Sequence, residues 1–304
     1  MSDPPLIEAD EARLASDAGL RAPAVSFASA GDRVILGGDC ALLVGALTGV
    51  PFAELDDDDA APSVARLAGG SLRVLGKDVA RQEHREVLGM MPATLAMPGD
   101  MTSLEMLRWV ARLATGKRRG SHALAEAALQ RLGLTALAKR RIVGLGVAER
   151  KGLALAAAIL GEPPALLLDH PLYGLDEAGQ HWMIQALGEL AGRHRLLITT
   201  PRLATDGALG ALVGAASDIV MLRNGAVVAQ GSPRALLAEA RSFTVTVERG
   251  AEALEERLQR MGAQLRGGPT HFTVRLEPSQ GPREILRAAH DTGAVVVACV
   301  PLVG

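Results

Sequence analysis

The length, composition and charge of this chain exclude several classes of protein. Its 304 residues are about twice a typical domain of roughly 150 residues, so the sequence predicts two domains. The formal net charge is −2, only 2% of the residues are aromatic, and Lys and Arg are nowhere gathered into a long stripe, so we do not expect nucleic acid as a partner.

Cysteine usage and apolar runs predict a cytoplasmic location. Cys40 and Cys299 are far apart and form no Cys-x-x-Cys motif, and the acidic start MSDPPLIEADE lacks the basic and then apolar order of a signal peptide. The longest apolar runs, 153–160 and 294–300, are far shorter than the roughly 20 residues that span a bilayer. We therefore expect neither a signal peptide nor a transmembrane helix.

Strand-like and helix-like segments alternate over roughly the first 240 residues. A strand at 34–37 precedes an apolar helix, and further buried strands are expected at 165–169 and 195–200. Short apolar strands separated by helices are typical of an α/β fold with a mostly parallel sheet that helices cover on both faces. Helical periodicity over 103–133 predicts an inserted helical subdomain at about residues 100–145.

The sequence after residue 200 predicts a β-hairpin and then a second, smaller domain. Asn224 and Gly225 lie between two alternating runs, which is the strongest short signal for a β-hairpin. From Phe243 onward the segments are strand, helix, strand, strand, helix and strand, and this βαββαβ order predicts a small α+β domain of ferredoxin-like type. The expected domains are therefore 1–240 and 241–304.

Five blocks of sequence point to one known family. They are GDRVILGG, TSLEMLRWVARL, GLGVAERKGLALAAAILGEPPALLLDHPLYGLD, RLLITTPRL and DIVMLRNGAVVAQGSP. In order and spacing they resemble the nucleotide-binding subunit of ATP-binding-cassette (ABC) transporters, over roughly residues 6–235. The resemblance is closest to the ABC-2 exporter type, which often carries a small domain after the cassette. It implies an ABC-ATPase P-loop-like cassette fold and a membrane permease as partner.

The phosphate-binding loop that the resemblance implies is altered. The family pattern G-x-x-x-x-G-K-[ST] would lie between Val34 and Leu47. Here the loop is about four residues shorter, Asp39 and Cys40 replace the lysine and the hydroxyl residue, and no Gly-Lys-Ser or Gly-Lys-Thr occurs elsewhere. Because a carboxylate repels phosphate, we expect Asp39 to cap the following helix instead, with the short loop closed over the former site.

The other positions that serve ATP in the family can be assigned residue by residue. Two aspartates are kept, one after the Walker B strand and one in the D-loop. The adenine-stacking aromatic, Q-loop glutamine, signature serine and glycine, catalytic glutamate and switch histidine are replaced. With the loop, the assigned positions are Ser16, Gly37, Gly38, Asp39, Cys40, Ala93, Gly146, Ala148, Asp169, His170, Asp176 and Pro201. These changes predict no catalytic residue, no metal ligand, and loss of ATP and Mg²⁺ binding.

Four polar features have an ordinary structural interpretation, which we favour. Asp169 alone is a poor Mg²⁺ site and is interpreted as a strand-end aspartate. Histidine is the residue type that most often serves as a general base, but His170 is interpreted as a plain polar side chain. The run Asp56–Asp59 lacks calcium-loop spacing and is interpreted as a solvated loop, and Cys40 as a packed thiol.

The resemblance leaves three functions open. We favour a non-catalytic ABC subunit that couples to or regulates an ABC-2 type permease beside a second, complete ABC ATPase subunit, and is therefore peripheral to the membrane. The retained segment 90–113, which lies where the permease docks in the family, favours this function. The alternatives are a soluble ABC-like scaffold or regulator without a permease, and an active ATPase with atypical residues.

Overall fold

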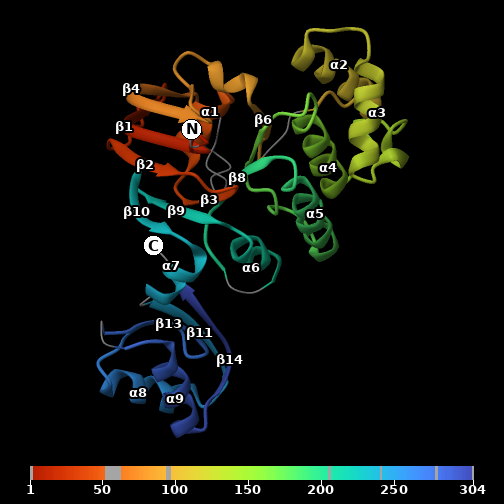
Figure 1. The fold of residues 1–304 in the computed structure, drawn as a ribbon. Coiled ribbons are helices and arrows are strands. Elements are labelled where there is room, and N and C mark those ends of the chain that lie inside the picture. Colours follow the sequence, from red (N-terminus) through yellow and green to blue (C-terminus); the bar gives the residue numbers. More distant parts are fainter. Residues whose placement is uncertain are drawn as a thin grey trace.

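The described part of the chain forms three β-sheets with helices packed on them (Figure 1). The computed structural model describes residues 3–51, 63–93, 97–204, 207–239, 242–277 and 280–302. The predicted solvated loop Asp56–Asp59 lies outside these residues. None of the described helices is long and apolar enough to cross a membrane.

A six-stranded sheet lies at the centre, in the order β10-β9-β3-β8-β7-β6. Its neighbouring strands are parallel except for β9 and β10, which form the hairpin predicted at Asn224 and Gly225. All four residues of β7 are buried, as expected for a strand covered on both faces. The strands are β3 (Arg33–Gly38), β6 (Leu88–Met91), β7 (Ala165–Leu168), β8 (Arg195–Thr200), β9 (Asp218–Arg223) and β10 (Ala226–Gly231).

Helices α2 to α7 share a hydrophobic core with one face of this sheet. The helical region predicted at 103–133 is two helices, because Gly116 adopts a φ of 66° and ends the first of them. Thr102 and Glu105 form a capping box that starts it. The helices are α2 (Ser103–Thr115), α3 (Ser121–Arg131), α4 (Val147–Ala158), α5 (Glu177–Leu190), α6 (Gly207–Gly214) and α7 (Pro233–Glu239), with 3₁₀ turns at Glu83–Glu86, Thr135–Leu137 and Ile142–Gly144.

An antiparallel sheet covers the other face, in the order β2-β1-β4-β5. Helix α1 (Ala41–Thr48) is apolar around its whole circumference and is packed into the core that the two sheets share. Packing of α1 in this core holds its N-terminus next to the end of β3. The strands are β1 (Ile7–Ser16), β2 (Val25–Ser29), β4 (Ala65–Val74) and β5 (Lys77–Asp78).

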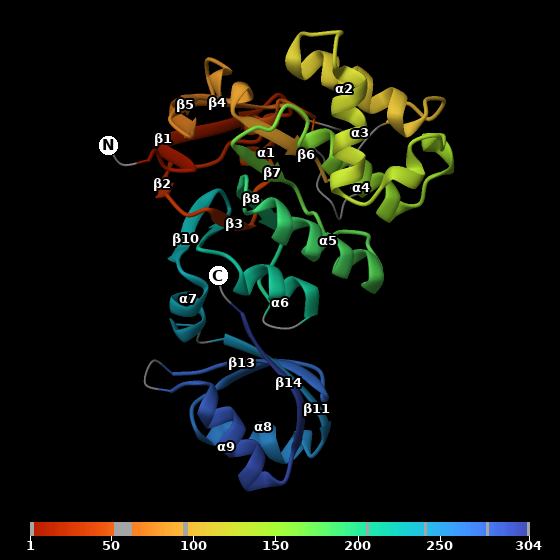
Figure 2. The same ribbon diagram turned by 45° about the vertical axis from the view of Figure 1, so that its right-hand side comes forward.

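The last part of the chain forms a third sheet with its own core. The order β12-β13-β11-β14, with α8 and α9 on one face (Figure 2), is the βαββαβ arrangement that the sequence predicts. Phe243, Phe272 and Ile285 belong to this core, which is distinct from the two cores described above. The elements are β11 (Ser242–Arg249), α8 (Ala251–Arg260), β12 (Gln264–Gly267), β13 (His271–Arg275), α9 (Pro282–Thr292) and β14 (Val295–Leu302).

Candidate functional site

The loop between β3 and α1 is held against β9. Gly38 has a φ of 81°, and a Cβ atom there would lie 2.1 Å from the carbonyl oxygen of Leu222. The next residue, Asp39, donates its N–H to that same carbonyl at 3.1 Å. The chain can therefore approach β9 this closely only because residue 38 is glycine.

The prediction that Asp39 caps α1 is wrong. The Asp39 carboxylate accepts a hydrogen bond from the main-chain N–H of Asn224 at 2.8 Å, in the turn between β9 and β10. The N-cap residue is Cys40, and among the residues that the structure describes no side chain caps the helix. The left-handed conformation of Gly38 directs Asp39 toward this turn, so the first N–H groups of α1 are left without a side-chain acceptor.

Cys40 is a packed thiol, as predicted. It is buried in the core between the two sheets. Burial raises its pKa well above the ordinary range, and the nearby carboxylates of Asp169 and Asp39 raise it further. The thiol is therefore not expected to be a reactive nucleophile.

A hydrogen-bonded cluster follows β7. Asp169 Oδ1 accepts from Thr199 Oγ1 at 2.6 Å and lies 2.7 Å from His170 Nδ1. The main-chain N–H of His170 donates to Thr199 Oγ1 at 2.9 Å. Burial would raise the pKa of Asp169, but the hydrogen bonds from His170 and Thr199 outweigh it and lower the pKa. Both residues are thus held in place by neighbouring side chains.

Lys151 joins this cluster from α4, and the sequence interpretation missed it. Its side chain is buried, with 8% exposed, and Nζ donates to the carbonyl oxygen of His170 at 2.8 Å. Burial lowers the pKa of Lys151 to about 8, although Asp169 acts in the opposite direction. The available signal was weak, because Lys151 follows the charged residues Glu149 and Arg150 and directly precedes the apolar run of α4. A buried lysine needs a partner, which the sequence alone did not identify.

Three further positions that the family resemblance assigns to the ATP site lie at the ends of strands or helices. The N–H of Ala93, just after β6, donates to Asp169 Oδ2 at 3.3 Å, so the Q-loop position reaches the cluster. Asp176 caps α5 by accepting from the N–H of Gly179 at 2.8 Å. Pro201 directly follows β8 and is exposed. The strand ends thus bring together residues that are far apart in the sequence.

Among the described residues, the predicted signature segment and adenine position form no hydrogen bonds with the cluster of Asp169, His170 and Thr199. Gly146 is the N-cap residue of α4, and its N–H donates to Glu149 Oε2 at 2.9 Å. Ala148 lies in the first turn of α4. Ser16 is buried at the end of β1, where its Oγ accepts from the N–H of Leu20 at 3.2 Å. Each of these residues has a local structural role.

The donor groups of the described residues do not form a metal site by themselves. Within this part of the chain, no three His, Cys, Asp or Glu side chains lie close enough together to hold an ion. The N–H groups at the start of α1, which no side chain of the described residues caps, and the helix dipole instead favour an anion. The site therefore fits a phosphate group better than an isolated cation.

Comparisons with known proteins relate the chain to ABC transporter subunits. No family model matches it. It is 25% identical over 230 residues to the uncharacterized ABC transporter ATP-binding protein YxlF of Bacillus subtilis, covering 75% of each chain. It is 29% identical over 225 residues to the probable multidrug ABC transporter ATP-binding protein YbhF of Escherichia coli, covering 68% of this chain but only 36% of YbhF.

Solved structures show the same fold. An ATP-binding cassette of an ABC transporter in its ADP conformation has 18% identity and a TM-score of 0.57, and covers 75% of this chain and 91% of its own. A bacterial Atm1-family ABC exporter with ATP bound has 19% identity and a TM-score of 0.58, and covers 78% of this chain and 40% of its own. The predicted cassette fold is thereby confirmed. Relatives and structures together support an ABC transporter ATP-binding cassette subunit.

These comparisons contradict two predictions. The chain was expected not to be an ATPase and not to bind ATP or Mg²⁺, but the relatives are named ATP-binding proteins, and their family points to ATPase activity. The physical reason is that both predictions considered only the side chains at the positions that bind ATP in the family. Phosphate is also attracted by main-chain N–H groups at a helix N-terminus, and Asp39 does not occupy those of α1.

Proposed function

We propose that this chain is the ATP-binding subunit of an ABC transporter that works on a membrane permease of the ABC-2 type. The observation that carries the proposal is the similarity to a named ABC transporter ATP-binding protein over 75% of both chains. In this proposal, residues 1–240 form the cassette, residues 241–304 form a C-terminal domain, and the subunit lies on the cytoplasmic side of the membrane, bound to the permease.

The nucleotide phosphates are proposed to bind at the start of α1. No side chain caps this helix, and the Asp39 carboxylate is directed toward Asn224. Asp169 and His170 directly follow β7, and Thr199 lies near the end of the neighbouring parallel strand β8, so the three residues meet at the same edge of the sheet. This edge is where ligands bind in open α/β sheets, and Mg²⁺ would enter together with ATP as a complex.

Titration of the full chain with Mg-ATP by isothermal calorimetry tests this site. We expect a dissociation constant below about 1 mM, because helix N-termini bind phosphate through several N–H groups. Mg-AMP, which lacks the two outer phosphates, should bind more weakly. If Mg-ATP gives no saturable heat up to roughly 5 mM, the proposed function is wrong.

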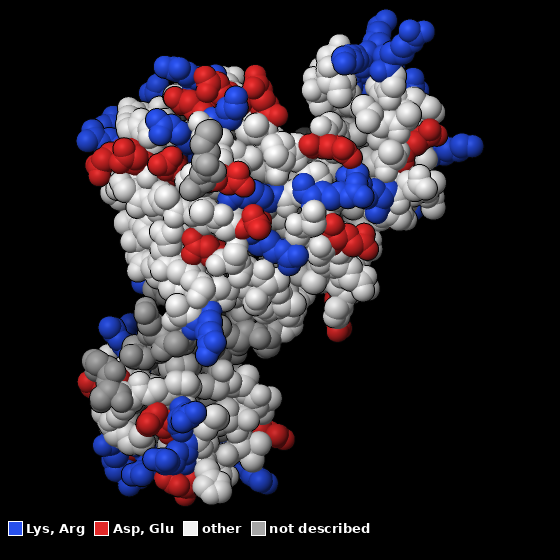
Figure 3. Space-filling view, viewed as in Figure 1, with Lys and Arg blue, Asp and Glu red and all other residues white. Residues whose placement is uncertain are grey.

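Helix α2 is the proposed docking surface for the permease. Trp109 and Leu113, one helical turn apart, have 51% and 65% of their surface exposed. On the face shown in Figure 3, by contrast, Lys and Arg are mixed with Asp and Glu and form no single basic stripe. Large exposed apolar side chains mark interaction surfaces more often than mixed charges do.

The docking proposal predicts that a Trp109→Glu, Leu113→Glu double variant loses the permease. Tagged full-length chain would be used to pull down permease from membranes, and we expect at least about tenfold less permease with this variant. The control is Val228→Glu, because Val228 on β10 is also apolar and exposed. Equal recovery by both variants would contradict docking at α2. Recovery of no permease even by the unchanged chain would favour the soluble scaffold instead.

A second ATP-binding subunit is proposed to contact the start of α4. Val143 and Val147, on either side of the N-cap residue Gly146, have exposed apolar side chains, and Tyr173 next to Gly174 is exposed as well. Val147 also lies against Gly174, just before the D-loop aspartate. This apolar area supports a protein contact close to the candidate nucleotide site. The same membrane pull-down reports whether a second cassette accompanies the permease.

A further inference from the structure

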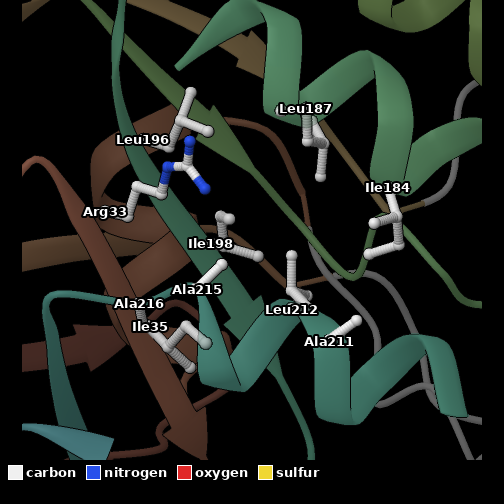
Figure 4. Close-up of a pocket in the computed structure, with 11 residues that line it drawn as sticks. Arg33, Ile35, Ile184, Leu187, Leu196, Ile198, Ala211, Leu212, Ala215 and Ala216 are labelled. Atoms are coloured by element: carbon white, nitrogen blue, oxygen red, sulfur yellow. The ribbon is translucent and has the colours of Figure 1, made fainter. Parts of the chain in front are cut away.

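A pocket of about 140 Å³ lies between α5 and α6, over strands β3 and β8 (Figure 4). It is separate from the candidate nucleotide site, since it opens beside the helices and not at the strand ends. Its lining is apolar except for one charged side chain, Arg33. The large apolar residues that line it are Ile35, Ile184, Leu187, Leu196, Ile198 and Leu212.

Arg33 is fixed at its main chain but free at its guanidinium. Its N–H donates to Ser217 Oγ at 3.0 Å, and its carbonyl oxygen accepts from the same hydroxyl at 2.8 Å. Within the described residues, the guanidinium has no hydrogen bond or ion pair. Figure 4 shows the side chain extended along the pocket beside Leu196 and Ile198. A cation is thus presented to an apolar space without an anion.

Two acidic residues near the starts of strands β3 and β9, Asp32 and Asp218, interact with other side chains. The neighbouring Arg195 donates to three main-chain carbonyl oxygens and pairs with Asp32 at 3.4 Å. Asp218 accepts from Ser29 at 2.6 Å and from Gln230 at 3.2 Å. No acidic residue lines the pocket itself. Within the described residues, an anionic ligand could therefore pair with Arg33 without displacing an acidic side chain.

We propose that this pocket binds a small amphiphilic carboxylate of about the size of benzoate. The apolar part would lie between α5 and α6, and the carboxylate would accept two hydrogen bonds from the Arg33 guanidinium. The size follows from the volume, because an apolar cavity of about 150 Å³ holds one benzene ring. Pockets that bind small molecules are typically lined by apolar side chains with a small number of polar groups.

Calorimetric or NMR titration of the full chain with benzoate and with uncharged benzyl alcohol tests the proposal. Benzoate should bind at least about tenfold more tightly than benzyl alcohol, because only benzoate pairs with Arg33. Arg33→Met should remove this preference and leave benzyl alcohol binding unchanged. The matched control is Arg66→Met, since Arg66 is an exposed arginine on β4.

A second variant keeps the test decisive if Arg33→Met does not fold. Ala215, directly after α6, lines the pocket and is exposed, so Ala215→Leu can project into the pocket without disturbing the core. It should weaken the binding of both probes at least about tenfold. No saturable benzoate binding by the unchanged chain up to roughly 10 mM, or benzoate binding that neither variant weakens, would overturn the proposal.

Discussion

Replacing Gly38 with alanine is expected to weaken Mg-ATP binding more than about tenfold and to lower the free energy of unfolding by about 3 kcal/mol. The φ of 81° would cost an L side chain about 1 kcal/mol or more. The new Cβ atom would lie 2.1 Å from the carbonyl oxygen of Leu222, which is backbone and cannot rotate away. The loop must therefore move away from β9, and the start of α1 moves with it.

The control for this variant is Gly19→Ala. Gly19 has a similar φ of 88°, but a Cβ atom there would have no heavy atom within 4 Å. It should therefore show the conformational cost of about 1 kcal/mol alone and unchanged nucleotide affinity. Urea unfolding and calorimetric titration measure the two effects. Equal destabilisation of both variants, with unaltered ATP binding in Gly38→Ala, would show that the loop does not position the phosphates.

Elements with a strong local signal could be predicted from the sequence. The apolar run that forms β7 is completely buried, and Asn224 and Gly225 form the turn between β9 and β10. The βαββαβ order after Phe243 is also present, because each of its segments has a clear period of its own. The antiparallel sheet of β1, β2, β4 and β5 was not predicted. In β1, for example, apolar and charged residues alternate from Ile7 to Asp10, but the consecutive charged residues Asp10 and Glu11 break the alternation at a β-bulge.

The geometry of the candidate site depends on contacts that are distant in sequence. The sequence correctly placed a loop at Gly38 and Asp39, but the acceptor role of Asp39 depends on Asn224, 185 residues away. Local capping preference alone favoured the wrong partner. Likewise, the contact between Lys151 and His170 exists only because α4 packs beside the end of β7. Motif comparison names positions, but it does not show which side chains reach one another.

The buried lysine predicts an unusual dependence of stability on pH. Burial lowers the pKa of Lys151 from its ordinary 10.5 to about 8 in the folded chain. Below pH 8 the lysine is protonated in both states, and the folded state carries the full cost of the buried charge. Between about pH 8 and 10.5 only the unfolded state still binds this proton, so folding becomes more favourable as the pH rises. The shift corresponds to roughly 3 kcal/mol.

Lys151→Met isolates this contribution. The variant keeps a side chain of similar length, removes the charge and loses the hydrogen bond to His170. We expect it to be more stable than the unchanged chain at pH 7 by about 1–3 kcal/mol, since replacing a buried charge by an apolar side chain is often stabilising. By about pH 10.5 this advantage should vanish or reverse, because the lysine of the unchanged chain is then neutral when folded.

The measurement is the difference in free energy of unfolding between the two proteins from pH 7 to 10.5, by urea titration. Burial also raises the pKa of Cys40, which lowers stability at alkaline pH, but this affects both proteins and cancels in the difference. Lys139→Met, at an exposed lysine, is the matched control for replacing a lysine by methionine. If the difference in free energy of unfolding between Lys151→Met and the unchanged chain does not change with pH, burial does not destabilise the charged form of Lys151.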